Sequence, residues 1–101
     1  MRTLMKVSIP VEQGNKGIQD GSLPRIIQQT LESLRPEAAY FTTDSDGSRQ
    51  ALVVFDLKDS SDIPVIAEPL FIGFGARVTM TPVMSAQDLQ AGLTKFAATA
   101  R

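Results

Sequence analysis

Glu68 has the most promising surroundings for acid–base chemistry of any carboxylate in this sequence. It lies within residues 66–70 (Ile-Ala-Glu-Pro-Leu), among apolar neighbours and directly before Pro69, where a helix should break. If its side chain points between a helix and a sheet, desolvation favours the protonated form and suits it to proton transfer. If it points outward, Glu68 is an ordinary solvated helix residue. The sequence leaves both interpretations open.

Tyr40 is the single tyrosine of the chain. Its hydroxyl could donate a hydrogen bond to a ligand carbonyl in a cleft, or it could pack at a sheet edge. With Glu68 as the acid–base group, Tyr40 and Asn15 would be the donors that orient a substrate. Asp20 and Arg77 could join the same cleft, or form surface salt bridges instead.

A stretch rich in polar groups over residues 15–22 could bind a small anion. A helix that begins at Ser22 could receive a carboxylate at its N-terminus, with Asn15, Lys16 and Asp20 close by. The alternative is a solvated loop in which the glycines make turns. Phe71 and Phe74 could line a pocket for an apolar ring, or they could belong to the hydrophobic core.

The composition excludes several classes of protein. Cysteine and histidine are absent, which excludes disulfides, thiol nucleophiles, Cys/His zinc sites, histidine-ligated haem and Ser-His-Asp triads. We therefore expect no metal site and no cofactor. The net charge of -1 argues against a nucleic-acid partner, although residues 14–17 match the Gly-x-x-Gly loop of KH domains. The strand that precedes this loop leaves no room for the helix that a KH domain requires there.

The length of 101 residues predicts one domain over residues 1–101. Hydrophobic residues make up 43% and charged residues 21%, which is typical of globular proteins. No signal-peptide run follows Met1 and no stretch is long enough to span a membrane. The sequence therefore predicts a cytoplasmic protein with no membrane partner.

Alternating and helical patterns predict the secondary structure. Residues 2–9 alternate as in a strand, and residues 11–22 read as an irregular helical turn followed by a loop. Ser22 should cap the next helix, with Pro24 in its first turn and Pro36 at its end. Two strands follow, residues 38–43 and 50–57, joined by a hairpin over residues 44–48.

The second half of the chain predicts a helix, a strand and a final helix. A helix should begin near residues 59–62, kink or restart near Pro69, and end at Gly73 and Gly75. Residues 76–83 form the fourth strand. Ser85 and Asp88 resemble a capping box for the last helix. That helix should bury its apolar side chains, namely Leu89, Leu93, Phe96, Ala97 and Ala100.

The order β-α-β-β-α-β plus a C-terminal helix predicts an α+β, ferredoxin-like fold with a four-stranded antiparallel sheet. The strand order should be 4-1-3-2, with both main helices on one face.

Residues 51–55 (Ala-Leu-Val-Val-Phe) are apolar on both sides of their strand, yet the helices cover only one side of the sheet. Each large side chain left in water forgoes ~1.5–3 kcal/mol. We therefore expect a homodimer in which a second copy covers the other face, although a lone sheet can tolerate a few exposed aliphatic side chains. Lys6 lies mid-strand on this face, where it should find a carboxylate or extend to the rim.

The chain resembles the dimeric α/β-barrel superfamily, in which two ferredoxin-like sheets pair face to face into a barrel. Residues 21–24 (Gly-Ser-Leu-Pro), 68–74 (Glu-Pro-Leu-Phe-Ile-Gly-Phe) and 81–84 (Thr-Pro-Val-Met) look like its small bacterial members that have no established activity. Relatives in the superfamily include quinone-forming monooxygenases, haem enzymes and muconolactone-type isomerases. Because this chain has no histidine, members that bind haem or use a histidine dyad are poor models for it.

Two functions follow as hypotheses. The first is a small-molecule-binding or structural module that holds a small organic ligand between helices and sheet. The second is a cofactor-independent monooxygenase or isomerase acting on an aromatic or lactone-like substrate, with Glu68 and Tyr40 as its catalytic groups. Fold alone does not choose between them.

Overall fold

Four strands form one antiparallel sheet in the computed structural model, which describes residues 1–99. The order across the sheet is β2-β3-β1-β4, which confirms the predicted order. β1 and β3 are central and pair along their whole length, from Arg2 opposite Asp56 to Ile9 opposite Arg49. The strands are β1 (Arg2–Ile9), β2 (Ala38–Thr43), β3 (Arg49–Asp56) and β4 (Arg77–Pro82).

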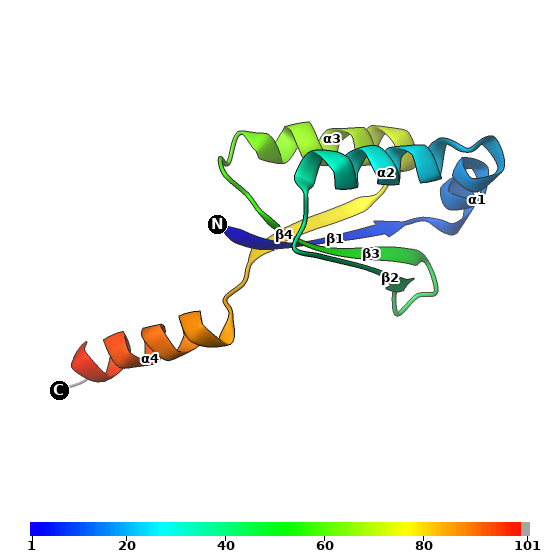
Figure 1. The fold of residues 1–101 in the computed structure, drawn as a ribbon. Helices are drawn as coiled ribbons and strands as arrows, with labels where there is room; N and C mark the ends of the chain where they lie inside the picture. Colours follow the sequence, from blue (N-terminus) through cyan, green and yellow to red (C-terminus); the bar gives the residue numbers. More distant parts are fainter. Residues whose placement is uncertain (100–101) are drawn as a thin grey trace.

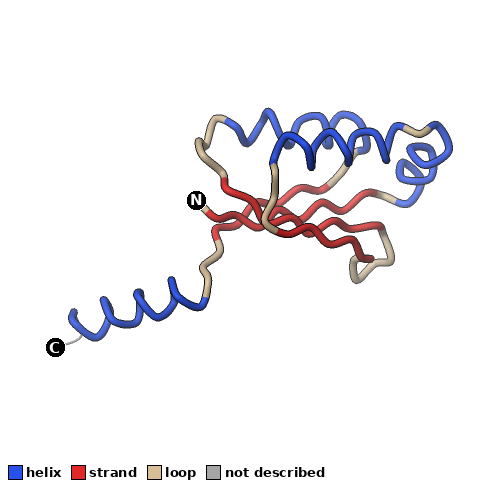
Figure 2. The backbone as a smooth tube through the Cα atoms, in the orientation of Figure 1, coloured by secondary structure: helices blue, strands red, loops and turns tan. Residues whose placement is uncertain are grey.

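Two of the four helices in residues 1–99 cover one face of this sheet and leave the other face open (Figures 1 and 2). The covering helices are α2 (Ser22–Leu34) and α3 (Asp62–Phe74), and α1 (Val11–Asp20) lies beside them at one end of the sheet. The fourth, α4 (Ala86–Thr99), points away from the other elements. The architecture is therefore the expected ferredoxin-like α+β fold. None of these helices is long and apolar enough to cross a membrane.

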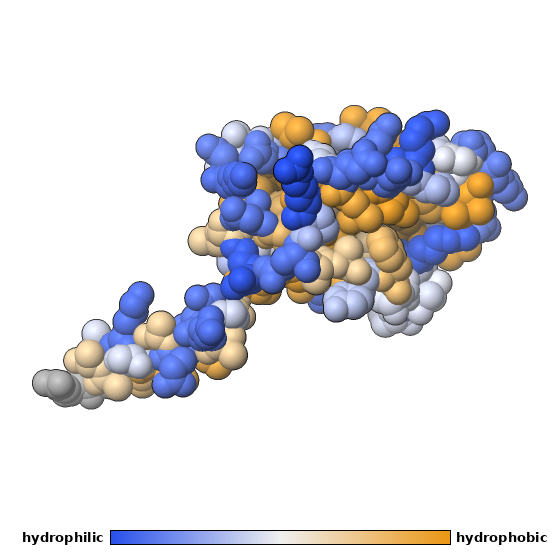
Figure 3. All heavy atoms as spheres, in the orientation of Figure 1, coloured by the Kyte–Doolittle hydropathy of each residue, from blue (hydrophilic) through white to orange (hydrophobic). Residues whose placement is uncertain are grey.

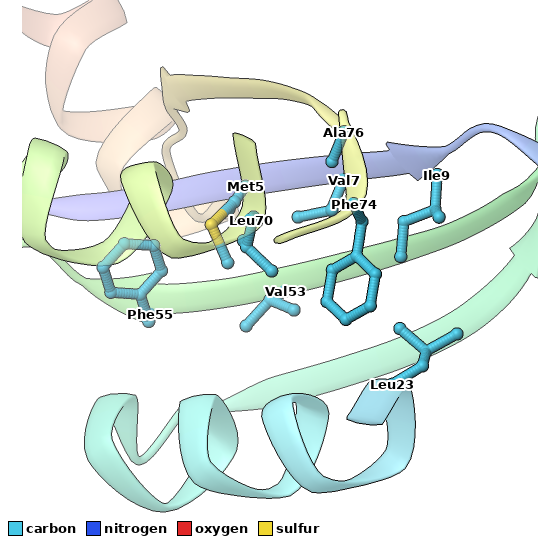
Figure 4. Close-up of a cluster of buried hydrophobic side chains, with 9 residues drawn as sticks. All are labelled: Met5, Val7, Ile9, Leu23, Val53, Phe55, Leu70, Phe74 and Ala76. Carbon is cyan, nitrogen blue, oxygen red and sulfur yellow. The ribbon is translucent and has the colours of Figure 1, made fainter. Parts of the chain in front are cut away.

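The hydrophobic core lies between the sheet and the covering helices (Figure 4). Alternation places every second side chain of β1 and β3 on this side, where Met5, Val53 and Phe55 are almost completely buried. Leu23 of α2 and Phe74 of α3 close the core on the side away from the sheet. The two faces of β3 therefore differ in burial, because Leu52 and Val54 lie on the open face and are only half-buried.

The first helix differs from the prediction, because residues 11–20 form a continuous ten-residue helix rather than an irregular turn and a loop. Gly14 and Gly17 are both buried within it. A Cβ on Gly17 would lie 2.8 Å from Leu23 Cβ and 3.0 Å from Phe74 Cε1. Tertiary packing at a close approach therefore overrides the low helix propensity of glycine, and residues 14–17 are not a KH-type loop.

The helix also does not restart at Pro69, one of the two predicted outcomes, because α3 is a single helix from Asp62 to Phe74 with Pro69 inside it. Proline leaves the carbonyl four residues earlier, that of Val65, without its helical donor. Val65 is 71% exposed and Pro69 is exposed. Water can therefore reach the freed carbonyl, and the helix continues.

The last helix begins as predicted but does not bury its apolar side. The Asp88 N–H donates to Ser85 Oγ over 3.1 Å and the Ser85 N–H to Asp88 Oδ2 over 3.0 Å, which confirms the capping box. However, Leu89, Leu93 and Phe96 are 48%, 53% and 67% exposed, and Ala97 is exposed as well. Ala100 lies outside the described residues. The expected burial of these side chains is therefore not met within a single chain.

Short connections explain why α4 stays away from its own chain. Only residues 83–85 separate β4 from α4. The Val83 N–H donates to the carbonyl of Arg2 over 3.0 Å, and Asp88 in the first turn of α4 accepts a hydrogen bond from Arg2 Nη1 over 3.3 Å. Both contacts tie the base of α4 to the start of β1, so the helix is directed outward, and the longest dimension of the molecule reaches 59 Å.

Replacing Gly17 with alanine should destabilise the protein by about 1–3 kcal/mol, because the new methyl group overlaps Leu23 and Phe74 in a packed core. Gly73→Ala is the matched control. No atom lies within 4 Å of a Cβ built there, so it should gain about 0.5–1 kcal/mol of helix propensity. Urea unfolding measures both free energies of unfolding. Equal stability of the two variants would contradict the close packing of α1.

Candidate functional site

A groove of about 470 Å³ lies on the helix-covered side of the sheet, between α2 and strands β1, β2 and β3. Its floor is formed by side chains of the core, including Met5 and Val53, and its wall by Ile27 and Leu31 of α2. The groove opens toward the edge strand β2, where the lining residue Phe41 is 56% exposed. Figure 3 shows hydrophobic side chains at the surface below α2 in this region.

The groove exists because α2 does not fully cover the outer part of the sheet. β2 is the edge strand, and Phe41 projects from it toward the helix side, paired with Ala51 on β3. Alanine at position 51 leaves space where a larger side chain would fill the gap. The small side chain of Ala51 and the edge position of β2 therefore together shape the cavity.

One end of the groove carries a positively charged side chain, Arg49, at the start of β3. Its Nη2 donates a hydrogen bond to Asn15 Oδ1 of α1 over 3.1 Å. The guanidinium also lies directly against Gly14, so closely that a Cβ on that residue would overlap it. Gly14, which lowers the helix propensity of this segment, thus leaves space for the arginine side chain.

The predicted anion site at the start of α2 is occupied by the chain itself. The Ser22 N–H donates to Asp20 Oδ1 over 2.8 Å, and the N-cap is Gly21, with a φ of 80°. Ser22 therefore does not cap the helix with its side chain, contrary to expectation. Hydrogen bonds from the Ser22 side chain and backbone lower the pKa of Asp20. An external carboxylate would have to displace this internal one.

The remaining predicted ligand-binding residues are dispersed. Asn15 contacts Arg49 at the end of the groove, whereas Lys16 is exposed on α1 and does not line it. Phe74 is 4% exposed and belongs to the core, as the alternative interpretation held. Phe71 lines a separate, smaller cleft between α3 and β4.

The two predicted catalytic residues do not meet. Glu68 is exposed on α3 and borders the cleft of about 320 Å³ that Phe71 also lines. Tyr40 is 67% exposed and lies on the open face of the sheet, opposite Leu52. A sheet separates the two side chains, so within one chain they cannot act on one substrate, and Glu68 lacks the enclosed position that proton transfer would use.

A polar cluster occupies one end of the open face. Ser8 Oγ donates to Asp44 Oδ2 over 2.7 Å and accepts from Gln50 Nε2 over 3.2 Å. Arg77 Nη2 lies 3.3 Å from Asp44 Oδ2 and 3.2 Å from Asp46 Oδ2. Arg77 therefore forms surface salt bridges, one of the two predicted outcomes, and does not share a cleft with Tyr40. No group of three or more metal-ligating side chains occurs within residues 1–99.

Sequence reasoning missed Arg49. In the sequence it follows a hairpin turn and looks like a solvated strand end. Its place at the groove depends on α1, which the glycines appeared to exclude. In the sequence, Gly14 offers space for a neighbouring side chain and Asn15 offers it a hydrogen-bond acceptor. This pair indicates a place for an arginine only if both residues are known to lie on a helix.

No protein-family model matches the chain, and no curated protein matches it in sequence. Among solved structures, the chain is similar to a crystal structure of a formyltetrahydrofolate deformylase from Pseudomonas putida KT2440, with a TM-score of 0.47 and 17% sequence identity. The match covers 81% of this chain but only 28% of the deformylase. The chain thus spans less than a third of that protein, and neither activity nor substrate follows from the match.

Asp46 in the β2–β3 hairpin should titrate with a pKa of about 2. Hydrogen bonds from the side chain and backbone of Ser48, 2.6 and 3.0 Å long, stabilise its charged form, and Arg77 adds to them. Because the folded pKa is depressed, this carboxylate stabilises the fold above its unfolded pKa of about 3.9, and the contribution is lost as the pH falls toward 2.

Carboxyl-carbon NMR titration measures this pKa. Ser48→Ala should raise it toward its ordinary value. Ser45→Ala is the control, since Ser45 hydrogen-bonds Asp44 instead. An ordinary pKa for Asp46 in the unmodified protein would show that the hairpin bonds do not persist in solution.

Proposed function

We propose that this protein binds a small, largely apolar organic molecule in the groove between α2 and the sheet. The observation that supports this is the groove itself, whose volume of about 470 Å³ lies within the ~300–1,000 Å³ common for ligand sites. Its walls are mostly aliphatic and aromatic, with a few polar groups at one end. This combination favours an apolar ligand body that a small number of polar contacts orient.

The energetics support an occupant. Side chains such as Phe41 and Ile18, 56% and 50% exposed, leave apolar surface in contact with water at the mouth of the groove. Covering that surface gains about 25 cal/mol per Å². A ligand that fills the groove would obtain this gain without rearranging the core beneath it.

A neutral fluorescent probe, N-phenyl-1-naphthylamine, should bind the protein with increased emission. Ala51→Phe places a ring in the groove and should weaken this binding at least about tenfold, since one lost apolar contact of 1.4 kcal/mol already gives that factor. Ile72→Phe is the control, because Ile72 is 83% exposed on α3 and lies outside the groove. Unchanged binding by Ala51→Phe would place the probe elsewhere and refute this site.

We further propose that the protein is a homodimer in which a second copy covers the open face of the sheet. The centre of this face is apolar and only half-buried, with Leu4 and Val54 paired across β1 and β3, and Leu52 beside them. Lys6 lies opposite Leu52 in the same region, and no carboxylate within residues 1–99 forms an ion pair with it. A partner copy can shield the apolar residues while Lys6 reaches the rim.

The exposed side of α4 supports the same partner. An isolated helix of 14 residues is only marginally stable in water, so α4 gains from packing against another surface. The stripe formed by Leu89, Leu93 and Phe96 recurs at helical spacing, and the connection at residues 83–85 directs it away from its own sheet. A second copy presents the apolar face that this stripe lacks.

The available area is sufficient for a specific dimer. Four strands with six-residue edges give the open face a flat footprint of about 20 by 19 Å. One side of α4 adds a strip of about 21 by 10 Å. Two copies joined through both surfaces would bury about 1,200 Å², above the ~1,000 Å² expected of a specific interface.

Light scattering during size-exclusion chromatography should give about twice the chain mass of 10.9 kDa. Leu52→Glu on the open face and Leu93→Glu on α4 should each shift the protein toward the monomer, because each places a charge in an apolar interface. Ala91→Glu, on the other side of α4, should leave the dimer intact. A stable monomer for the unmodified protein would refute the dimer. A dimer lost only with Leu52→Glu would exclude α4 from the interface.

A further inference from the structure

We propose that Arg49 makes the groove selective for a ligand with a carboxylate at one end of an apolar body. This inference rests on the groove being a binding site, as proposed above, and adds the chemical class of the ligand. It follows from where the charge lies in the groove, how the guanidinium is held, and what it is not paired with.

Arg49 is the single charged side chain among the groove-lining residues of the described chain. Thr43, which pairs with Arg49 across β2 and β3, lies at the same end, whereas aliphatic residues such as Leu31 and Leu70 also line the groove. A ligand that matches both ends has an apolar body and a polar, negatively charged head. A purely apolar ligand would leave the guanidinium beside it without a partner.

The guanidinium is held by neutral groups. Asn15 Oδ1 accepts one hydrogen bond from Nη2, and Gly14 offers a flat surface without a side chain. A guanidinium has five N–H donors arranged as a fork that fits a carboxylate. The contact with Asn15 therefore fixes the orientation of Arg49 and leaves other donors available to a ligand.

The charge of Arg49 is not neutralised within residues 1–99, where no carboxylate oxygen lies within 4.0 Å of it. Two other arginines show the contrast. Arg2 pairs with Glu37 and Asp88, and Arg77 pairs with Asp44 and Asp46. Asn15, uncharged, stands where an acidic residue would have cancelled the charge, so an anionic ligand supplies the missing negative charge.

Decanoate and 1-decanol test this inference, because they share an apolar chain and differ in the charge of the head group. Displacement of N-phenyl-1-naphthylamine gives the affinity of each. The unmodified protein should bind decanoate at least about tenfold more tightly than decanol, as expected for a charge-assisted contact. Arg49→Gln should abolish this preference by weakening the binding of decanoate.

Three further variants separate position from charge. Lys16→Gln removes a positive charge from α1 outside the groove and should keep the preference for decanoate. Gly14→Ala pushes the guanidinium from its place and should reduce the preference while keeping the charge. Arg49→Lys keeps the charge but loses the fork, and should give an intermediate preference. Circular dichroism confirms that each variant is folded.

The outcomes distinguish this inference from the proposed function. Equal affinity of the unmodified protein for both ligands would overturn the role of Arg49 and leave the groove as an apolar binding site. An equal loss of preference in Lys16→Gln would also overturn it, because the effect would then come from overall charge. If neither ligand displaces the probe and the probe itself does not bind, both the groove function and this inference are wrong.

Discussion

The structure depends on one constraint, namely that a four-stranded sheet with apolar residues on both faces has helices on only one of them. On the covered face, Met5, Val53 and Phe55 are removed from water by α2 and α3. On the other face, Leu52 and Val54 remain half-buried. β3 carries large apolar side chains on both sides, Val53 and Phe55 on one and Leu52 and Val54 on the other, but helices cover only the first pair. The proposed second copy follows from this imbalance.

The groove on the covered face has a similar cause, since the helices there do not cover the whole sheet. Two main helices span four strands, and the edge strand β2 is left with Phe41 at the rim. α1 then closes one end, and it can do so only because Gly14 and Gly17 lack side chains where the helix meets Arg49, Leu23 and Phe74. The glycines that lower the stability of an isolated helix therefore permit the tertiary contacts that stabilise this one.

Local patterns predicted most of the fold. The alternation in β1, the turn around Gly47 and the capping box of Ser85 and Asp88 depend on residues close in sequence, and each is present. The strand order followed because right-handed crossovers leave few arrangements for this element order. The failures concern positions where distant contacts or solvent decide the outcome. α1 forms through packing, and α3 continues past Pro69 because Val65 is exposed to water.

The candidate site was harder to predict because it depends on three elements at once. Arg49 comes from β3, Asn15 from α1 and the apolar wall from α2, so no short motif contains it. Residue type and sequence neighbours predicted catalytic roles for Glu68 and Tyr40. These features do not determine the side of a sheet or helix on which a side chain lies. Tyr40 lies on the open face because it pairs with Leu52, a register that is set by the hairpin several residues away.

The distribution of charge separates the two incompletely covered surfaces of the molecule. On the open face, the arginines at either end are neutralised by carboxylates of the same chain, Arg2 by Glu37 and Arg77 by Asp44 and Asp46. Between them the face is apolar apart from Lys6, which suits a partner with the same kind of face. In the groove, Asn15 orients Arg49 without cancelling its charge. The arginines at the ends of the open face are thus paired with carboxylates, whereas Arg49, beside which an anionic ligand is proposed, is not.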